Sequence, residues 1–520
     1  MNVKLTIKNY RCFPDSRPAE LELREGFTAL IGSNNSGKSS LLRFFYEFRN
    51  LFQLLSTVNN NFIEAVRGGS QAFSVPGSIG DINELFNDGN DRPITIDLTL
   101  PSVGEGILGR VQVTVPRGSN NWTVTTPGID LGPRDTIGFG QDQLTFPAGT
   151  LHLAMFFDAC QALSDTLYIG PFRNAINIGS NEAYFDIKVG QSFITQWRQY
   201  KTGPNKALNV AAFDLTDQVR RIFGFGGLEI NPDPGDQTLQ VFIDGRSYRL
   251  PELGAGLTQF FLVLANAAAR KPAFILIDEP ELNLHPSLQL DFLTTLASYA
   301  TRGVLFGSHS VGLARAAAER IYSVRRIQQG ESEVTPYVAT PRLAEFLGEL
   351  SFGGYKELGF EQILLVEGPT DVKTMQQFLR LYGKEHQIVL LPLGGRDTVN
   401  AKAEEQLREI KRITDKVAAV VDSERLAAGA PLEARIQGFR QACVNATVAC
   451  HVLDKRATEN YLVDRAVQQV KGPKYRALSD FEKLDQMTPN WSKGENWRIA
   501  RAMTQQEIAN TDLGLFIQSL

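Results

Sequence analysis

Alternating and continuous apolar stretches predict the first elements of the chain. "VKLTIKNY", residues 3–10, alternates apolar and polar side chains, which predicts a half-buried β-strand. "GFTALIG", residues 26–32, is mostly apolar and predicts a buried strand that leads into a glycine-rich loop. "KSSLLRFFYEFRNLF", residues 38–52, repeats its apolar positions at helical spacing. The chain is therefore predicted to begin with a small β unit, followed by a strand, a glycine loop and a helix.

The middle of the chain combines turn-rich segments with buried elements. Residues 70–150 are rich in Gly, Pro, Asn and Asp and hold short β-like runs, which predicts strands joined by turns. Residues 151–225 mix helical stretches with loops, and residues 258–270 have a helical pattern. "AFILID" at 273–278 and "GVLFGSHS" at 303–310 are apolar runs typical of strands in a parallel sheet.

A second α/β pattern follows a connecting region at residues 330–360. The apolar runs "QILLVEG", "IVLLPLGG" and "AAVVDSE" predict three further buried strands. A chain of 520 residues is too long for one hydrophobic core. We therefore predict two α/β domains, at residues 1–345 and 358–520, the second with a Rossmann-like parallel sheet and a C-terminal helical extension.

Composition and charge narrow the class of protein. A hydrophobic share of 43% and a charged share of 21% are typical of globular proteins, and a net charge of −4 excludes a basic surface over the whole chain. The chain has neither an apolar run of bilayer length nor a signal-peptide pattern, so we expect a cytoplasmic protein without membrane contact. The four cysteines form no CxxC pair, which argues against a zinc site.

The glycine loop matches the full phosphate-loop pattern Gly32-x4-Gly37-Lys38-Ser39, between a strand and a helix. Glycines let backbone N–H groups turn toward phosphate oxygens, and the helix N-terminus adds a favourable dipole. Lys38 would neutralise the β- and γ-phosphates, and Ser39 would ligate Mg²⁺. A polar turn without a ligand is the alternative. The other residues assigned to the nucleotide are Asn34, Asn35 and Ser40.

Two later strand ends carry the residues that nucleotide hydrolysis needs. Asp278 ends the strand in "FILIDEPELNLHP" and would hold Mg²⁺, while Glu279 beside it would orient or deprotonate the attacking water. The alternative is an acidic cap for the next helix. His309 in "LFGSHS" follows one βα unit later, where it could contact the γ-phosphate.

These motifs together resemble the ATP-binding-cassette ATPases, in the branch shared with the Rad50 and SMC proteins. The family's signature loop resembles "ELGAGLTQFF", with Gly254 in the position of the usual serine and Gly256 in that of the signature glycine. The resemblance implies an ABC-type P-loop domain with inserted helical and β segments. It also implies a homodimer or higher homo-oligomer that sandwiches ATP, with a helical dimerisation insertion around residues 175–225.

The second domain places acidic residues at predicted strand ends. Glu367 follows "ILLV", with Asp371 one helical turn later, and Asp422 and Glu424 follow "AAVV". The carboxyl ends of parallel strands are where α/β sheets form sites. Clustered carboxylates suit Mg²⁺ or Mn²⁺, and two such ions can cleave a phosphodiester. The alternative is that each residue only caps a helix or strand.

This second pattern resembles the Toprim domain, and the order of domains resembles the OLD (overcoming lysogenisation defect) family of nucleases. Asp422-Ser423-Glu424 stands where Toprim domains usually have Asp-x-Asp. The resemblance implies a two-metal site with Glu459 as a further ligand. It also implies a cation that stabilises developing phosphate charge, for which Lys493 and Lys474 compete.

The resemblance implies an ATP-regulated, divalent-metal-dependent DNA endonuclease. It also implies a role in defence against phage, with an accessory protein or nucleic acid as a partner. The alternative is an SMC-like or Rad50-like ATP-dependent clamp on nucleic acid, whose Toprim site is degenerate and which recruits another effector.

Overall fold

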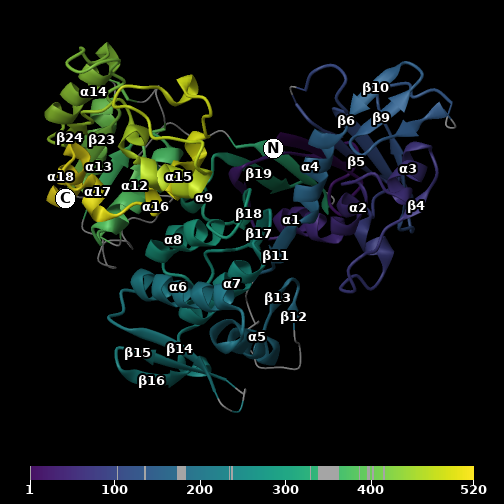
Figure 1. The fold of residues 1–520 in the computed structure, drawn as a ribbon, viewed down its shortest axis with the longest axis horizontal. Helices are drawn as coiled ribbons and strands as arrows, with labels where there is room; N and C mark the ends of the chain where they lie inside the picture. Colours follow the sequence, from purple (N-terminus) through teal and green to yellow (C-terminus); the bar gives the residue numbers. More distant parts are fainter. Residues whose placement is uncertain are drawn as a thin grey trace. The chain divides into compact units, whose positions relative to one another are not determined.

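The computed structural model describes residues 2–520, with gaps at residues 102, 134–135, 172–182, 234, 236–237, 328–329, 338–361, 386, 395–398, 401–402 and 414–415. The chain packs as two compact units (Figure 1). Unit 1 comprises Met1–His285, Asp291–His309 and Arg320–Tyr337. Unit 2 comprises Pro286–Leu290, Ser310–Glu319 and Val338–Leu520. The predicted change of domain between residues 345 and 358 lies outside the described residues.

Unit 1 begins with an antiparallel sheet in the strand order β2-β1-β5-β6-β7-β4. The predicted alternating strand is β1. Its alternate side chains Val3, Leu5 and Ile7 are buried, while the side chains between them are exposed or half-buried. The strands are β1 (Asn2–Lys8), β2 (Ala19–Arg24), β4 (Gln71–Ala72), β5 (Ile94–Thr99), β6 (Arg110–Val115) and β7 (Asn121–Thr125). A smaller antiparallel sheet contains β8 (Gly138–Phe139), β9 (Gln143–Phe146) and β10 (Gly149–His152).

The second large sheet of unit 1 positions the predicted nucleotide residues. Its order is β11-β17-β18-β3-β19-β20, and all neighbouring strands are parallel except the last pair. Because β17, β18 and β3 are adjacent, the segments that follow their carboxyl ends meet at one edge of the sheet. The strands are β3 (Gly26–Ile31), β11 (Thr166–Ile169), β17 (Phe274–Asp278), β18 (Gly303–Ser308), β19 (Arg320–Arg326) and β20 (Ser332–Pro336).

Helices fill the space around these two sheets. Helix α1 contributes Leu41, Leu42 and Phe44 to a hydrophobic core that also contains side chains of both large sheets. Helix α4 adds Phe156 and Phe157 to the same core. The helices around the two sheets are α1 (Lys38–Glu47), α2 (Arg49–Leu54), α3 (Asn60–Val66), α4 (Ala154–Ser164), α7 (Ala255–Arg270) and α8 (Pro286–Ala297).

An insertion between β11 and α7 forms a separate layer of unit 1. Helices α5 (Gly190–Thr202) and α6 (Lys206–Ile222) pack against each other and against β14 (Leu228–Pro232). β14 pairs with β15 (Leu239–Ile243), which pairs with β16 (Arg246–Arg249). Both helices lie within the segment predicted to be a helical insertion, although residues 175–182 of that segment are not described. The three-stranded sheet was not predicted.

Unit 2 is built on a four-stranded parallel sheet in the order β22-β21-β23-β24. Its strands β21, β22 and β23 are almost entirely apolar because both faces are covered: Leu364 and Val366 of β21 face one core, and Ile363 and Leu365 face the other. The parallel sheet predicted for the second domain is therefore confirmed. The strands are β21 (Gln362–Val366), β22 (Ile388–Pro392), β23 (Val417–Val421) and β24 (Ala449–Val452).

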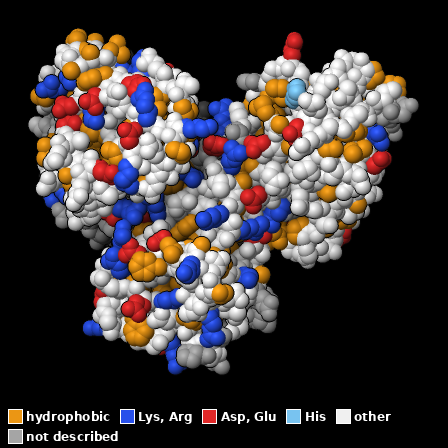
Figure 2. Space-filling view, viewed as in Figure 1, with side chains coloured by type: hydrophobic (Ala, Val, Ile, Leu, Met, Phe, Trp, Pro, Cys, Tyr) orange, Lys and Arg blue, Asp and Glu red, His pale blue; other side chains and the backbone are white. Residues whose placement is uncertain are grey.

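Helices cover both faces of the unit 2 sheet, and the C-terminal segment is helical as predicted. The helices are α12 (Pro369–Leu381), α13 (Glu404–Ile413), α14 (Ala434–Asn445), α15 (Asp464–Lys471), α16 (Asn496–Arg501), α17 (Gln505–Ile508) and α18 (Asp512–Ser519). Helix α9 (Val311–Ala317) also belongs to this unit, where it packs against α12, and Glu319 just after it forms an ion pair with the fully buried Lys373 of α12. Acidic and basic side chains are interspersed over the visible face of the molecule (Figure 2).

Candidate functional site

The phosphate loop lies between the end of β3 and the start of α1. Gly37 has a φ of 105°, which favours glycine, and a Cβ there would lie 2.9 Å from the Cys12 Sγ atom. A Cβ on Gly32 would lie 2.1 Å from the Val324 carbonyl oxygen. Both glycines of the motif are therefore required by the packing of the loop.

Lys38 lies inside the loop and is 4% exposed. Its Nζ atom donates hydrogen bonds to the carbonyl oxygens of Gly32 at 2.8 Å and Ser33 at 2.9 Å, and lies 3.4 Å from His309 Nε2. Burial lowers the pKa of Lys38, and the negative charges of Asp278 and Glu279 oppose this shift. The lysine is held at the loop, where it can meet an anionic ligand.

Asp278, Glu279 and His309 come together from the ends of β17 and β18. His309 Nε2 lies 3.2 Å from Glu279 Oε1, and the His309 backbone N–H donates to Glu281 Oε1 at 2.7 Å. Burial raises the pKa of Asp278, and Lys38 is among the groups that oppose the rise. The Ser39 hydroxyl lies close enough to Asp278 to oppose the same rise. A buried carboxylate beside a hydroxyl, next to the phosphate loop, suits a Mg²⁺ ion.

A cavity of about 700 Å³ opens over this loop. The predicted residues that line it are Asn34, Asn35, Gly37, Lys38, Ser39, Ser40, Glu279 and His309. Sequence reasoning missed five further lining residues: Ser36 within the loop itself, and Cys12, Pro171, Arg326 and Gly330. The last four come from segments that have no phosphate-binding motif, and only the fold brings them to the loop.

Gly254 and Gly256 do not line this cavity. Gly254 precedes the first turn of α7. A Cβ on Gly256 would lie 2.5 Å from the Asn283 carbonyl oxygen, so this glycine allows α7 to pack against the loop that follows β17. Within one copy of the chain, the structure therefore gives Gly256 a packing role.

The predicted acidic residues of unit 2 lie at adjacent strand ends. Glu367 directly follows β21, and Asp422 directly follows the neighbouring strand β23. Asp371, in the first turn of α12, accepts a hydrogen bond from the Gly368 backbone N–H at 3.1 Å. Asp422 Oδ1 accepts hydrogen bonds from the backbone N–H and the hydroxyl of Thr458, at 3.0 and 3.1 Å.

The pKa values of these carboxyl groups show that their charges act on one another. Burial, and after it the charge of Asp422, raises the pKa of Glu367 to about 8 and that of Asp371 to about 7. Burial also raises the pKa of Asp422 and of Glu459. A group of carboxyl groups that resist ionisation together is typical of a site that receives a cation.

Lys493 lies beside two carboxylates of this group, Glu459 and Asp422. Its Nζ atom lies 3.3 Å from Glu459 Oε2 and 3.7 Å from Asp422 Oδ2. Burial alone would lower the pKa of Lys493, but Asp422 and Glu459 outweigh it and raise the pKa above its usual value. Lys474, the competing candidate, is exposed.

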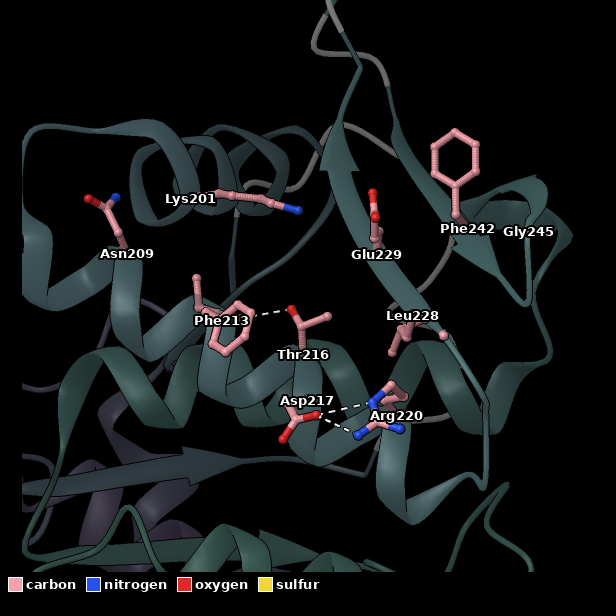
Figure 3. A pocket seen from close by; sticks show the side chains of 12 residues that line it. Lys201, Asn209, Phe213, Thr216, Asp217, Arg220, Leu228, Glu229, Phe242 and Gly245 are labelled. Atoms are coloured by element: carbon pink, nitrogen blue, oxygen red, sulfur yellow. Dashed lines mark hydrogen bonds and ion pairs between the residues drawn. The ribbon is translucent and has the colours of Figure 1, made fainter.

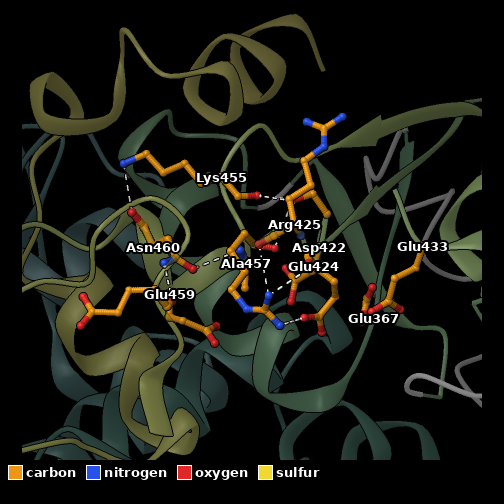
Figure 4. A network of polar contacts seen from close by, with 12 residues as sticks. Glu367, Asp422, Glu424, Arg425, Glu433, Lys455, Ala457, Glu459 and Asn460 are labelled. Carbon is orange, nitrogen blue, oxygen red and sulfur yellow. Dashed lines mark hydrogen bonds and ion pairs between the residues drawn. The ribbon is translucent and has the colours of Figure 1, made fainter. Parts of the chain in front are cut away.

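Glu424 is paired with an arginine. Arg456 forms an ion pair with the Glu424 carboxylate and donates to the backbone carbonyl oxygens of Glu424 at 2.9 Å and Arg425 at 3.1 Å. Figure 4 shows Glu424 in the same network of polar contacts as Asp422 and Glu459. These contacts use most of the donors of the Arg456 guanidinium. Arg456 therefore fixes the strand-end turn, and Glu424 is the predicted ligand least free to bind a metal.

Among the residues that the structure describes, no three His, Cys, Asp or Glu side chains are arranged to hold a metal ion as they stand. Two observations nevertheless fit a cation. Glu367 Oε1 is buried and has no hydrogen-bond partner in the described part of the chain, and Arg435 Nη1 lies 3.7 Å away from it, too far for a hydrogen bond. Asp371 and Asp422 are buried as well. Arg435 was missed by sequence reasoning because "LEARIQGF" carries no recognisable motif.

A second cavity, of about 740 Å³, lies in the insertion of unit 1 between α6 and the β14–β15 pair (Figure 3). Ala212, Phe213, Leu228 and Phe242 form its apolar part, and an ion pair between Asp217 and Arg220 lies beside it. Phe213 is 72% exposed, which is unusual for so large an apolar side chain.

Comparisons with known proteins agree with the nucleotide site. Residues 1–103 match the family described as "AAA ATPase domain", and residues 163–315 match the family described as "AAA domain, putative AbiEii toxin, Type IV TA system". No curated protein matches the chain. The first matched stretch contains the phosphate loop, and the second contains Asp278, Glu279 and His309. The matches and the geometry of the loop therefore support an ATPase that binds nucleotide.

Solved structures similar to the chain include three SMC head domains. One, bound to the C-terminal winged-helix domain of ScpA, is 12% identical, with a TM-score of 0.38 over 64% of this chain and 96% of that one. The head from Thermotoga maritima is 17% identical, with a TM-score of 0.34 over 65% and 100%. A head bound to a ScpA domain derived from Pyrococcus furiosus is 11% identical, with a TM-score of 0.35 over 68% and 100%. No helix in the described part of the chain is long and apolar enough to span a bilayer.

Proposed function

We propose that the protein is an ATP-regulated, divalent-metal-dependent DNA endonuclease or nickase of the OLD type, with unit 2 as its Toprim nuclease domain. The observation that carries this proposal is the convergence of Glu367, Asp371 and Asp422 at the carboxyl ends of β21 and β23, with Lys493 beside them. Defence against phage, with an accessory protein or nucleic acid as partner, is the biological role that this family resemblance supports.

We call Glu367, Asp371, Asp422 and Glu459 the acidic cluster. These four carboxylates would hold Mg²⁺ or Mn²⁺, and the bound metal would activate a water molecule and neutralise the leaving oxygen. Lys493, which pairs with Glu459 and Asp422, would place a positive charge where negative charge develops on the phosphate. Thr458 keeps Asp422 oriented through its two hydrogen bonds.

A plasmid-nicking assay tests this function. Wild-type protein is expected to convert supercoiled plasmid to nicked circles in Mg²⁺ or Mn²⁺ and to leave it intact in EDTA. Asp422→Asn should remove this activity, because the amide lacks the negative charge with which the Asp422 carboxylate would hold the metal ion. Asp480→Asn, at an exposed ion pair with Lys455, is the matched control. Metal-dependent nicking that survives Asp422→Asn would refute the assignment.

The insertion of unit 1 is the proposed homodimer interface. Its apolar cavity and the exposed Phe213 offer a surface that a second copy of the chain could cover. Phe213→Ser is expected to weaken dimerisation about 30-fold, because a buried aromatic anchor contributes about 2 kcal/mol. Sedimentation equilibrium measures the effect, and Leu515→Ser, at an exposed residue of unit 2, is the control. An unchanged dimer constant would exclude this face.

The second candidate function is an ATP-dependent nucleic-acid clamp that recruits another effector. The ion pair between Glu424 and Arg456 favours it, because a carboxylate tied to arginine is a poor metal ligand. Gly254, which lacks the hydroxyl of the usual serine, is a second observation in its favour. DNA binding without nicking in either metal, with or without ATP, would select this function.

A further inference from the structure

The two arginines next to the acidic cluster differ in how their donors are used. Arg456 donates short hydrogen bonds to the Glu424 carboxylate and to two backbone carbonyl groups. Arg435, in the first turn of α14, makes only long contacts: Nη1 lies 3.7 Å from Glu367 Oε1, and Nε lies 3.6 Å from Glu433 Oε2. Its Nη1 and Nη2 atoms are buried and have no hydrogen-bond partner among the described residues. One arginine is a structural clamp, and the other has donors to spare.

Buried guanidinium nitrogens without partners are costly, since each loses hydrogen bonds to water and gains none. Glu367 cannot satisfy Arg435, because 3.7 Å exceeds the length of a charge-assisted hydrogen bond. The Arg435 side chain is 19% exposed, so its donors are close to the surface yet enclosed by protein. An anion that reaches the cluster would supply the missing acceptors.

The chemistry of that anion follows from the shape of the donor group. A guanidinium presents two parallel N–H groups that match the two non-bridging oxygens of a phosphodiester. The position next to Glu367 places these donors beside the carboxylates that would hold the metal ions. We propose that Arg435 binds the scissile phosphate of the DNA substrate, an assignment that rests on the nuclease function proposed above.

Binding measurements that do not need cleavage test this role. DNA binding in Ca²⁺ is followed by fluorescence anisotropy of a labelled duplex over a range of KCl concentrations. Arg435→Ala is expected to weaken binding about 10- to 100-fold, as for the loss of hydrogen bonds to a charged group. The slope of log affinity against log salt should fall by about 0.9, the value for one phosphate contact. Arg435→Lys should recover part of the affinity, which also shows that the position tolerates replacement.

A competing role for Arg435 is to support metal binding by holding Glu367 ionised. Calorimetric titration with Mn²⁺ separates the two roles because they predict opposite signs. If Arg435 binds phosphate and does not support the metal site, its positive charge only repels the metal ion. The Arg435→Ala variant should then bind Mn²⁺ as well as wild type or more tightly. If Mn²⁺ affinity falls instead, while DNA affinity at saturating Ca²⁺ and its salt slope stay unchanged, the proposal is wrong.

A matched control and the nicking assay complete the experiment. Arg440→Ala removes an exposed arginine from the same helix, and it should bind DNA and nick plasmid like wild type. Arg435-dependent DNA binding by a wild-type protein that never nicks would refute the nuclease function and leave the phosphate contact standing. Nicking that is equally fast in Arg435→Ala at limiting DNA would refute the phosphate contact and leave the nuclease function standing.

Discussion

Glu367→Gln is expected to abolish metal-dependent nicking and, in EDTA at pH 8, to make unit 2 more stable than in the wild type. Glu367 is 8% exposed, and its Oε1 atom has no hydrogen-bond partner among the described residues. Losing a metal ligand removes several kcal/mol of transition-state stabilisation, which lowers the rate by about a thousandfold. The gain in the stability of unit 2 has a different cause, because glutamine removes the buried negative charge of Glu367.

The sign of the stability effect follows from the pKa of Glu367. Burial, with the charge of Asp422, raises this pKa from 4.5 to about 8, so the folded state binds more protons than the unfolded state between these values. The free energy of unfolding therefore falls as pH rises from about 4.5 to about 8. By pH 8 the folded state has lost most of this stability, and glutamine, which carries no charge, avoids the loss.

Hydrogen exchange of β21 and β23 in increasing urea measures this stability within unit 2. Wild type and Glu367→Gln should converge near pH 4, and Mg²⁺ should stabilise wild type alone at pH 8. Glu482→Gln is the contrasting control, because Arg476 lowers the pKa of Glu482 to about 2 and its loss should not stabilise the unit. Equal stability of wild type and Glu367→Gln at pH 8 would mean that Glu367 carries no buried charge.

Lys38→Ala is expected to weaken binding of Mg²⁺-ATP about a hundredfold. Lys38 is buried inside the phosphate loop, and it is the one lysine among the described residues that line the cavity above it. Its hydrogen bonds to a charged phosphate contribute about 3 kcal/mol, which corresponds to that factor in the dissociation constant. Calorimetric titration with ATP and Mg²⁺ measures the change.

The control for this variant is Lys4→Ala, which removes an exposed lysine of unit 1 that pairs with Glu20. It should bind ATP like wild type. Nicking by Lys38→Ala without ATP should also match wild type, because the acidic cluster belongs to unit 2. If the Lys38→Ala variant binds ATP as tightly as wild type, the loop is a polar turn that does not bind phosphate through Lys38.

Local signals in the sequence were sufficient for the elements that carry the site. Continuous apolar runs predicted β3, β17, β18, β21 and β23, because strands covered on both faces exclude polar side chains along their length. The motif around Gly37 predicted the phosphate loop, because only glycine allows that backbone. The three-stranded sheet of the insertion escaped prediction, since its short strands are interrupted by Gly, Asp and Pro residues.

Only the tertiary structure decided which of these signals meet. His309 reaches Lys38 and Glu279 because β17, β18 and β3 are neighbours, and nothing within a short window of sequence encodes that order. The same holds for Lys493, which reaches Asp422 and Glu459 while Lys474 stays exposed. Arg435 and Arg456 look alike in the sequence, yet Arg456 donates to a carboxylate and two carbonyl groups, while the Nη1 and Nη2 atoms of Arg435 have no hydrogen-bond partner among the described residues.

The sequence by itself determined the chemistry available to this protein: a phosphate loop, two strand-end acids with a histidine, and a second group of carboxylates after apolar strands. The tertiary structure alone decided which of these charges share a buried space, how they shift one another's pKa, and which cations remain available to a substrate. The physical reason is the distance along the chain over which each effect acts. Backbone preference and hydrophobic periodicity act over a few residues, whereas electrostatic coupling depends on distances in space that only the complete fold sets.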